Sequence, residues 1–195
     1  MDIFNQIFEL KEDPKKVKEG MILISEPLGR DLFFKKSVVL IVEHNSVGTV
    51  GFVLNKPFHF PIKELINDFP NASSFVSLGG PVEPDTLHFL HTEGNIIEDA
   101  KEVIPGIFWG GDFEQLQQNV HSGAVDTQKV RFFLGYSGWA PGQLDEEIKN
   151  SQWIVSSISN LEILNSPMEM WEKCVFELGD RFKAWLNVPE VPTMN

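Results

Sequence analysis

The chain has 195 residues, a length that favours one domain at about 150 residues per domain, and 42% of them are hydrophobic, which argues against a disordered or fibrous protein. Its 16 Lys and Arg against 28 Asp and Glu give a net charge of −12, unlike the basic surfaces that bind the phosphates of nucleic acids. A single cysteine excludes an intramolecular disulfide framework and a cysteine-rich zinc site. We therefore expect one domain over residues 1–195 that does not bind nucleic acid directly.

The N-terminal segment has Ile3, Phe4, Ile7 and Phe8 at helical spacing, which predicts a short helix that ends before Pro14. The segment lacks the basic patch and apolar core of a secretory signal, and no apolar run approaches the roughly 20 residues that span a bilayer. We expect a cytoplasmic protein with no membrane partner. The apolar stripe could cover the protein's own core or contact a second copy, so monomer and homodimer both stay open.

Runs of β-branched and other apolar residues follow. Residues 21–24 predict a strand, and residues 37–44 and 49–55 flank a short Asn/Ser/Gly turn, which predicts a β-hairpin. These strands are apolar nearly throughout, so we expect both of their faces to be buried. Pro61 can occupy a first helical position, and the apolar spacing over 62–69 predicts a two-turn helix.

The middle of the chain alternates between short strands and a helix. Residues 75–78, 86–91 and 104–109 predict three further strands. Asp112 precedes a glutamine by three residues, which is an N-cap arrangement with a reciprocal side chain, and the helix it begins should stop by the glycine at 123.

The C-terminal third has the same mixed character. Residues 129–136 predict a strand that enters a Gly/Pro-rich turn, and an acidic helix with Leu144 and Ile148 on one side follows. Residues 153–158 predict a strand, and a capping box over 166–169 predicts the last long helix. Because hairpins come early and helices late, the order favours an α+β fold over a doubly wound parallel sheet.

Ser137 lies in a Gly-Tyr-Ser-Gly-Trp segment, which resembles the tight turn on which hydrolases expose a nucleophilic serine. The match is imperfect, because Trp139 stands where the second glycine belongs and no histidine follows His121. Other triads use an upstream histidine, so a hydrolase using Ser137, or a water activated by His44 or Asp112, is the alternative function. We favour a structural turn at this position, and a protein that is not an enzyme.

Metal and cofactor signals are absent from the sequence. His88 and His91 are three residues apart on a predicted strand and should point to opposite faces, and no cysteine completes a ligand set, so we expect no metal. The pairs Gly79-Gly80 and Gly110-Gly111 precede no Lys-Ser/Thr pair, and no dinucleotide-binding glycine pattern occurs, so we expect no cofactor.

Several polar residues and glycines lie at the borders of the apolar runs. If the glycine-rich turns converge, these residues line one cleft, with Trp139 as an apolar wall and Asn55 and Gln143 as hydrogen-bonding groups. The predicted ligand-binding cleft consists of His44, Asn55, Gly110, Gly111, Asp112, Tyr136, Trp139 and Gln143.

Six segments carry a family resemblance: Gly20–Pro27, Ser37–His44, Gly51–Pro57, Gly79–Val82, Trp109–Asp112 and Phe133–Leu144. In this order they resemble the YqgE/AlgH family of bacterial proteins, and the resemblance covers about residues 18–180. The predicted N-terminal helix and the Pro-rich C-terminal tail lie outside it.

The resemblance implies an α+β fold in which a bifurcated, mostly antiparallel sheet curls into a pseudo-barrel with helices around it. It implies no established catalytic residue, and similar proteins often have alanine at the position of Ser137, which weakens a serine nucleophile. Members are often labelled transcriptional regulators because of a genetic link to the control of alginate production. We therefore expect a regulatory, interaction or ligand-binding protein that acts indirectly, through a protein partner or a small ligand.

Overall fold

The structure, a computed structural model, describes residues 16–29, 31–66, 68–69, 75–164 and 168–189. The strands are β1 (Ile22–Ser25), β2 (Val38–Asn45), β3 (Gly48–Val53), β4 (Pro57–Pro61), β5 (Phe75–Leu78), β6 (Val82–His91), β7 (Lys101–Ile104), β8 (Ile107–Trp109), β9 (Val130–Trp139) and β10 (Trp153–Ser156). The helices are α2 (Phe113–Ser122), α3 (Gln143–Lys149), α4 (Asn160–Leu164), α5 (Met170–Glu177) and α6 (Lys183–Leu186), with 3₁₀ turns η1 (Ile62–Glu64), η2 (Thr127–Lys129) and η3 (Asp180–Phe182). The predicted helix over 3–8 lies outside the described residues, as does most of the tail.

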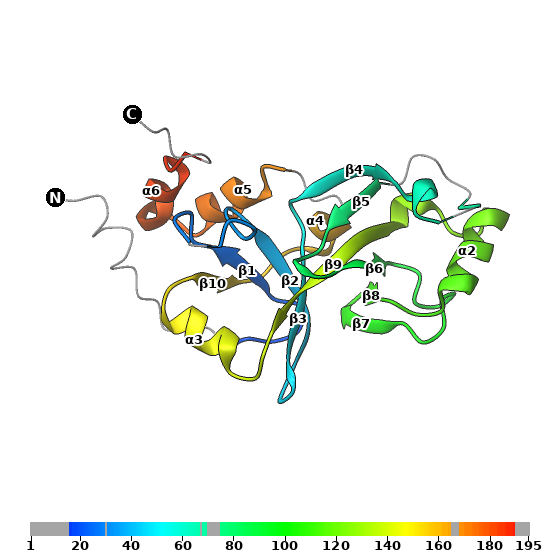
Figure 1. The fold of residues 1–195 in the computed structure, drawn as a ribbon, viewed down its shortest axis with the longest axis horizontal. Coiled ribbons are helices and arrows are strands. Elements are labelled where there is room, and N and C mark those ends of the chain that lie inside the picture. The colour runs from blue at the N-terminus through cyan, green and yellow to red at the C-terminus, as the bar shows by residue number, and fades with distance from the viewer. Residues whose placement is uncertain (1–15, 30, 67, 70–74, 165–167, 190–195) are drawn as a thin grey trace.

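The strands form one mostly antiparallel sheet that branches at β9. Its main path runs β10-β1-β2-β3-β9-β6-β8-β7. The C-terminal part of β9 pairs with β3 at residues 137–139, whereas its N-terminal part pairs in parallel with β5 at residues 132–134, and β4 extends that branch. In Figure 1, β9 runs between two halves of the molecule, with α2 at one end and α3, α5 and α6 at the other.

The sheet does not close within the described residues. Its path ends at β10 and at β7, and these two strands do not pair with each other. The fold is therefore α+β with a large branched sheet, and the predicted curl into a pseudo-barrel is not confirmed.

Gly135 marks the point where β9 passes from one branch to the other. Its φ of +63° is one that residues with a Cβ rarely adopt, and a Cβ there would lie 2.7 Å from the carbonyl oxygen of Gly80. Beyond it the strand continues to Trp139, because Ser137 pairs with Gly51 of β3. The prediction that the strand turns after residue 136 was wrong, since pairing with β3 overrides a glycine-rich local sequence.

Two other predicted elements differ from the structure. Residues 104–109 form a hairpin and not one strand, because Pro105 and Gly106, with φ of +82°, make a two-residue turn between β7 and β8. Of the two-turn helix predicted over 61–69, the described residues form only the single turn η1, which starts after Pro61 because Pro61 belongs to β4 and pairs with Phe75.

Helix ends follow the sequence in part. Asp112 accepts a hydrogen bond from the backbone N–H of Gln115 and Gly123 ends α2 with φ of +76°, as predicted. The prediction that the Gln115 side chain bonds back to the N-cap was wrong, because this side chain accepts from the backbone N–H of Glu98. Helix α5 begins at Met170, and residues 166 and 167 of the predicted capping box lie outside the described residues.

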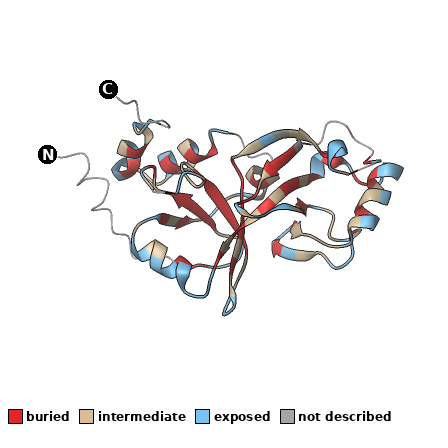
Figure 2. Ribbon diagram, viewed as in Figure 1, coloured by how far each residue is buried: buried red, intermediate tan, exposed pale blue. Residues whose placement is uncertain are grey.

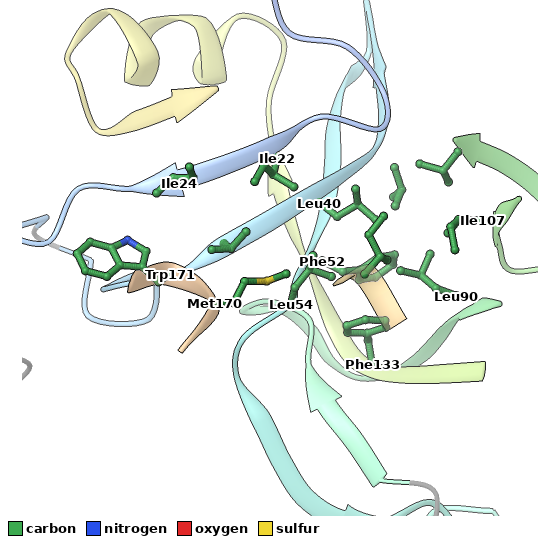
Figure 3. Close-up of a cluster of buried hydrophobic side chains, with 14 of the residues drawn as sticks. Ile22, Ile24, Leu40, Phe52, Leu54, Leu90, Ile107, Phe133, Met170 and Trp171 are labelled. Carbon is green, nitrogen blue, oxygen red and sulfur yellow. The ribbon is translucent and has the colours of Figure 1, made fainter. Parts of the chain in front are cut away.

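The core lies on both sides of the central strands, and Figure 2 shows buried residues concentrated along β1, β2 and β9. The first five residues of β2 are buried, which confirms the prediction that both of its faces are covered. Figure 3 shows Phe52 beside Phe133, whose ring centroids are 5.0 Å apart, and Met170 and Trp171 of α5 in the same cluster. The indole N–H of Trp171 donates to the Ser25 carbonyl at 2.9 Å, which joins α5 to β1.

Arg131 holds the two branches together. Its guanidinium donates to the carbonyl oxygens of Leu54 and Ile163 and, at 3.2 Å, to the hydroxyl of Ser77, so it joins the segment after β3, helix α4 and strand β5. No carboxylate of the described residues lies within ion-pair distance. Burial therefore lowers the pKa of Arg131 to about 10.

Candidate functional site

A cavity of about 650 Å³ lies where the end of β9, helix α3, the start of β10 and the loop after β1 meet. We call it the tryptophan pocket. Its lining residues are Ser25, Glu26, Gly29, Asp31, Phe34, Pro81, Gly138, Trp139, Gln143, Glu147, Asn150, Gln152 and Trp153. The pocket depends on the sheet order, because β1 pairs with β10 and so brings the loop after β1 beside Trp153.

Three aromatic side chains form one wall of the tryptophan pocket. Phe34 stacks on Trp139 with ring centroids 6.1 Å apart, and it meets Trp153 edge-on at 5.3 Å. Trp139 and Trp153 are themselves edge-on at 5.8 Å. Each ring thus contacts the other two, and such aromatic pairs add stability beyond the area they bury.

Glu147 holds this wall in place through three hydrogen bonds. Its Oε2 accepts the indole N–H of Trp139 and that of Trp153, each at 2.8 Å. Its Oε1 accepts from the Gln143 side chain at 2.9 Å, because residues four apart lie on the same face of α3. All three donors are neutral, and no lysine or arginine within the described ranges forms an ion pair with Glu147.

Two further carboxylates line the pocket. Glu26 is half-buried, and burial raises the pKa of its carboxyl. Asp31 accepts the backbone N–H of Phe33 at 2.8 Å. No basic side chain is among the described lining residues, and the intervening Arg30 lies outside the described residues.

The structure brings together two of the eight residues predicted to line one cleft. Trp139 and Gln143 both line the tryptophan pocket. Tyr136 lines a second, shallower cavity of about 350 Å³, which shares Gly138 and Trp139 with the tryptophan pocket and also includes Thr49. His44 does not line either cavity, but its Nδ1 lies 2.7 Å from the hydroxyl of Thr49.

The other predicted cleft residues lie elsewhere. Asn55 is buried, and its side chain accepts from the Val38 N–H at 2.9 Å and donates to the Lys36 carbonyl at 2.8 Å. It therefore fixes the backbone at the start of β2, and it lines neither of the two cavities. Gly110, Gly111 and Asp112 precede α2, at the opposite end of the molecule from α3 in Figure 1.

Ser137 has no hydrolase geometry. It lies inside β9 with no exposed surface, and its hydroxyl donates to the Gly79 carbonyl at 3.0 Å. The side chain of Asp112 caps a helix, and His44 bonds Thr49, so neither activates Ser137. The turn that suggested a nucleophile is a strand.

Neither the buried His91 nor any cluster of metal-binding side chains among the described residues offers a second candidate site. The Nε2 of His91 lies 2.9 Å from the Gly110 carbonyl, and its Nδ1 accepts the Glu93 N–H at 3.1 Å, so both ring nitrogens are used. Among the described residues, no group of three or more His, Cys, Asp or Glu side chains could hold a metal ion. No helix formed by these residues has the length and apolar character needed to cross a membrane.

The residues that complete the tryptophan pocket were not predicted. Glu147 entered the prediction only as an acid of an acidic helix, Trp153 only as the start of a strand, and Phe34 was assigned no role. The one local signal was the four-residue spacing of Gln143 and Glu147, which places both side chains on one helix face close after Trp139.

Together, the branched antiparallel sheet, the helices packed at both ends and the lined cavity define an α+β protein with a candidate ligand pocket. A protein-family profile described as AlgH-like matches residues 22–183. The chain therefore belongs to the AlgH-like family, which confirms the resemblance found in the sequence.

Its relatives agree over nearly the whole length. The chain is 43% identical over 180 residues to a UPF0301 protein of Chlorobaculum parvum, covering 92% of this chain and 96% of that one. It is 39% identical over 198 residues to a UPF0301 protein of Parabacteroides distasonis, covering all of both chains.

Two solved structures share the fold. A crystal structure of a Corynebacterium diphtheriae protein gives a TM-score of 0.74 at 21% identity, with 92% of this chain and 96% of that chain covered. The solution structure of the AlgH protein from Pseudomonas aeruginosa gives 0.72 at 24% identity, with 88% and 94% covered.

Proposed function

We propose that this protein binds a small organic molecule in the tryptophan pocket and works as a regulatory or interaction protein of the cytoplasm. The observation that carries the proposal is the cavity of about 650 Å³ with an aromatic wall. Small-molecule sites are concave, mostly apolar, and about 300 to 1,000 Å³ in volume, with a few fixed polar groups. Glu147 and Gln143 are such groups, because their mutual hydrogen bond fixes their orientation.

The regulatory step is indirect in this proposal. A chain with a net charge of −12 lacks the clustered positive charge from which proteins draw sequence-independent affinity for DNA. The ligand-bound protein would instead act on a protein partner, as a monomer or as a homodimer.

The first test is native mass spectrometry of the protein purified from its own host, followed by denaturing analysis for small molecules. We expect a retained small molecule in the wild type. Gly29 lines the pocket, so a large side chain at this position should fill part of the cavity. The protein should tolerate a side chain there, because a Cβ on Gly29 meets only ordinary contacts, 3.6 Å from the Glu26 carbonyl oxygen and 3.8 Å from its Oε1. Gly29→Leu should therefore fold and lose the ligand, and Gly29→Ala, the matched control, should keep it.

The proposal fails if Gly29→Leu retains the same molecule as the wild type, since the ligand would then lie elsewhere. It also fails if nothing is retained and a fragment library leaves the indole N–H resonances of Trp139 and Trp153 unmoved in NMR spectra.

A further inference from the structure

We propose that the ligand of the tryptophan pocket is an organic ammonium cation, recognised by the aromatic wall of Trp139 and Trp153 together with the carboxylates of Glu147, Glu26 and Asp31. This inference rests on the proposed function, because it names the chemical class of the ligand for the same pocket.

The first argument is the composition of the wall. Tryptophan is the aromatic side chain that attracts cations most strongly, because the face of the indole carries partial negative charge. The indole N–H of each tryptophan is directed at Glu147, so the positive edge of each ring is already occupied. A ligand that enters the pocket therefore finds neither indole N–H free to donate to a negative charge, which favours a cation over an anion.

The second argument is the charge on Glu147. Three neutral donors satisfy its hydrogen bonds, but neutral groups do not cancel a charge, and no described cation pairs with it. The two tryptophans that donate are only 6% and 5% exposed, so water screens this side of the carboxylate poorly. An ammonium group in the cavity would supply the missing counter-charge.

The third argument is the rest of the lining. Glu26 and Asp31 bring the described carboxylates to three, with no described lysine or arginine among the lining residues. The side chain of Glu26 forms no hydrogen bond or ion pair with the described part of the chain, although it is half-buried. Burial raises the pKa of Glu26, which a cation beside it would reverse.

The test compares ligands of one shape and different charge. Choline, the neutral isostere 3,3-dimethylbutan-1-ol and the anion 3,3-dimethylbutanoate are each titrated into the full chain, with the Trp139 and Trp153 indole N–H resonances as the readout. We expect choline to bind at least about tenfold more tightly than the neutral isostere, and the anion to bind more weakly than both. Because n-butylammonium carries N–H donors that choline lacks, comparing it with butan-1-ol repeats the test for a primary amine.

Variants locate the charge effect. Glu26→Gln and Asp31→Asn should each weaken choline binding about threefold to tenfold and leave the affinity for the neutral isostere unchanged. Glu146→Gln is the matched control. Glu146 is exposed on α3, the helix that carries Glu147, pairs with Lys149 and does not line the pocket. Neither Glu26 nor Asp31 bonds the tryptophans, so these variants should fold.

The outcomes separate the two proposals. If the neutral isostere binds as tightly as choline, or the anion binds best, the cation inference is overturned while the pocket remains a ligand site. If native mass spectrometry yields a retained ligand that is neutral or anionic, the inference is likewise overturned. If no probe shifts either indole resonance and no ligand is retained, the proposed function fails as well.

Discussion

Trp139 and Trp153 donate their indole N–H groups to one and the same atom, Oε2 of Glu147, at 2.8 Å each. The two tryptophans come from the end of β9 and the start of β10, and the acceptor from α3, so a single oxygen joins three elements. The pocket wall is therefore fixed before any ligand arrives, and this preorganisation lowers the ordering cost of binding.

Removing that shared acceptor should destabilise the protein. In Glu147→Ala two nearly buried indole N–H groups lose their partner, and each unsatisfied donor costs about 1 to 3 kcal/mol, so we expect a loss of about 2 to 6 kcal/mol. Urea unfolding followed by circular dichroism measures it. Glu146→Ala is the control, because its exposed pair with Lys149 is screened by water and contributes little to stability. Equal losses in both variants would contradict the assigned role of Glu147.

Glu26 should make stability depend on pH. Because its pKa is raised above the ordinary 4.5 in the folded protein, the folded state binds this proton more tightly than the unfolded chain does. The stabilisation is present below pH 4.5 and is lost as the pH rises through the folded pKa. Glu26→Gln should therefore be more stable than the wild type at pH 7 and equal to it below about pH 4. A difference that stayed constant from pH 4 to pH 7 would refute this reading.

His91 should take up its second proton less readily in the folded protein than in the unfolded chain. Because Nδ1 accepts the Glu93 N–H, the proton is on Nε2, which donates to the Gly110 carbonyl, and desolvation lowers the pKa of this buried ring below 6.5. As the pH falls below 6.5 the unfolded chain takes up the proton first, so stability falls there. Long-range ¹H–¹⁵N NMR spectra at neutral pH should show the Nε2–H tautomer, and the ring should take up its second proton at a lower pH than an unfolded histidine does. An Nδ1–H tautomer, or protonation at a higher pH than in the unfolded chain, would disprove the assignment.

Ser137→Ala should have only a small effect on stability and none on ligand retention. It removes one buried hydrogen bond to the Gly79 carbonyl, worth about 0.5 to 1.5 kcal/mol, and should leave the retained ligand unchanged in native mass spectra. Ser137→Thr adds a methyl group where there is no exposed surface and should cost about 1 to 3 kcal/mol. If the protein hydrolysed ester, phosphoester or peptide substrates and folded Ser137→Ala did not, the alternative of a hydrolase with Ser137 as its nucleophile would be supported.

Gly80→Ala should prevent normal folding. A Cβ on Gly80 would lie 2.0 Å from the carbonyl carbon and oxygen of Tyr136, so the backbone of β9 would have to move. We expect a loss of at least about 3 kcal/mol, measured as the yield of soluble protein and by urea unfolding. Gly29→Ala, which meets no close contact, is the control and should match the wild type.

Local patterns predicted the strands well where burial decides the structure. The hairpin of β2 and β3 lies where two runs of β-branched residues on either side of an Asn/Ser/Gly turn predicted it. Local hydrophobicity was a sufficient signal there, because both strands are covered on two faces. The end of β9 could not be predicted, because its strand conformation comes from pairing with β3, some 85 residues earlier in the chain.

The candidate site shows the same limit. Trp139 and Gln143 lie close together in sequence, and their joint position in a pocket was predicted. Phe34 and Trp153 reach the pocket only because β1 pairs with β10, which no local pattern encodes. Asn55 has the chemistry of a ligand-binding residue, but it is buried and both its amide oxygen and its amide nitrogen bond the backbone of Val38 and Lys36.

Strand β9 carries Arg131 near one end and Trp139 at the other, and at about 3.3 Å per residue these anchors are roughly 26 Å apart. Successive side chains of a strand alternate between faces, so inserting or deleting one residue between the anchors would turn one of them to the wrong side. The number of residues in this strand therefore fixes both the distance between Arg131 and Trp139 and the faces on which they lie. A change in the length of the segment between positions 131 and 139 would therefore separate the pocket from the branch point in a single step.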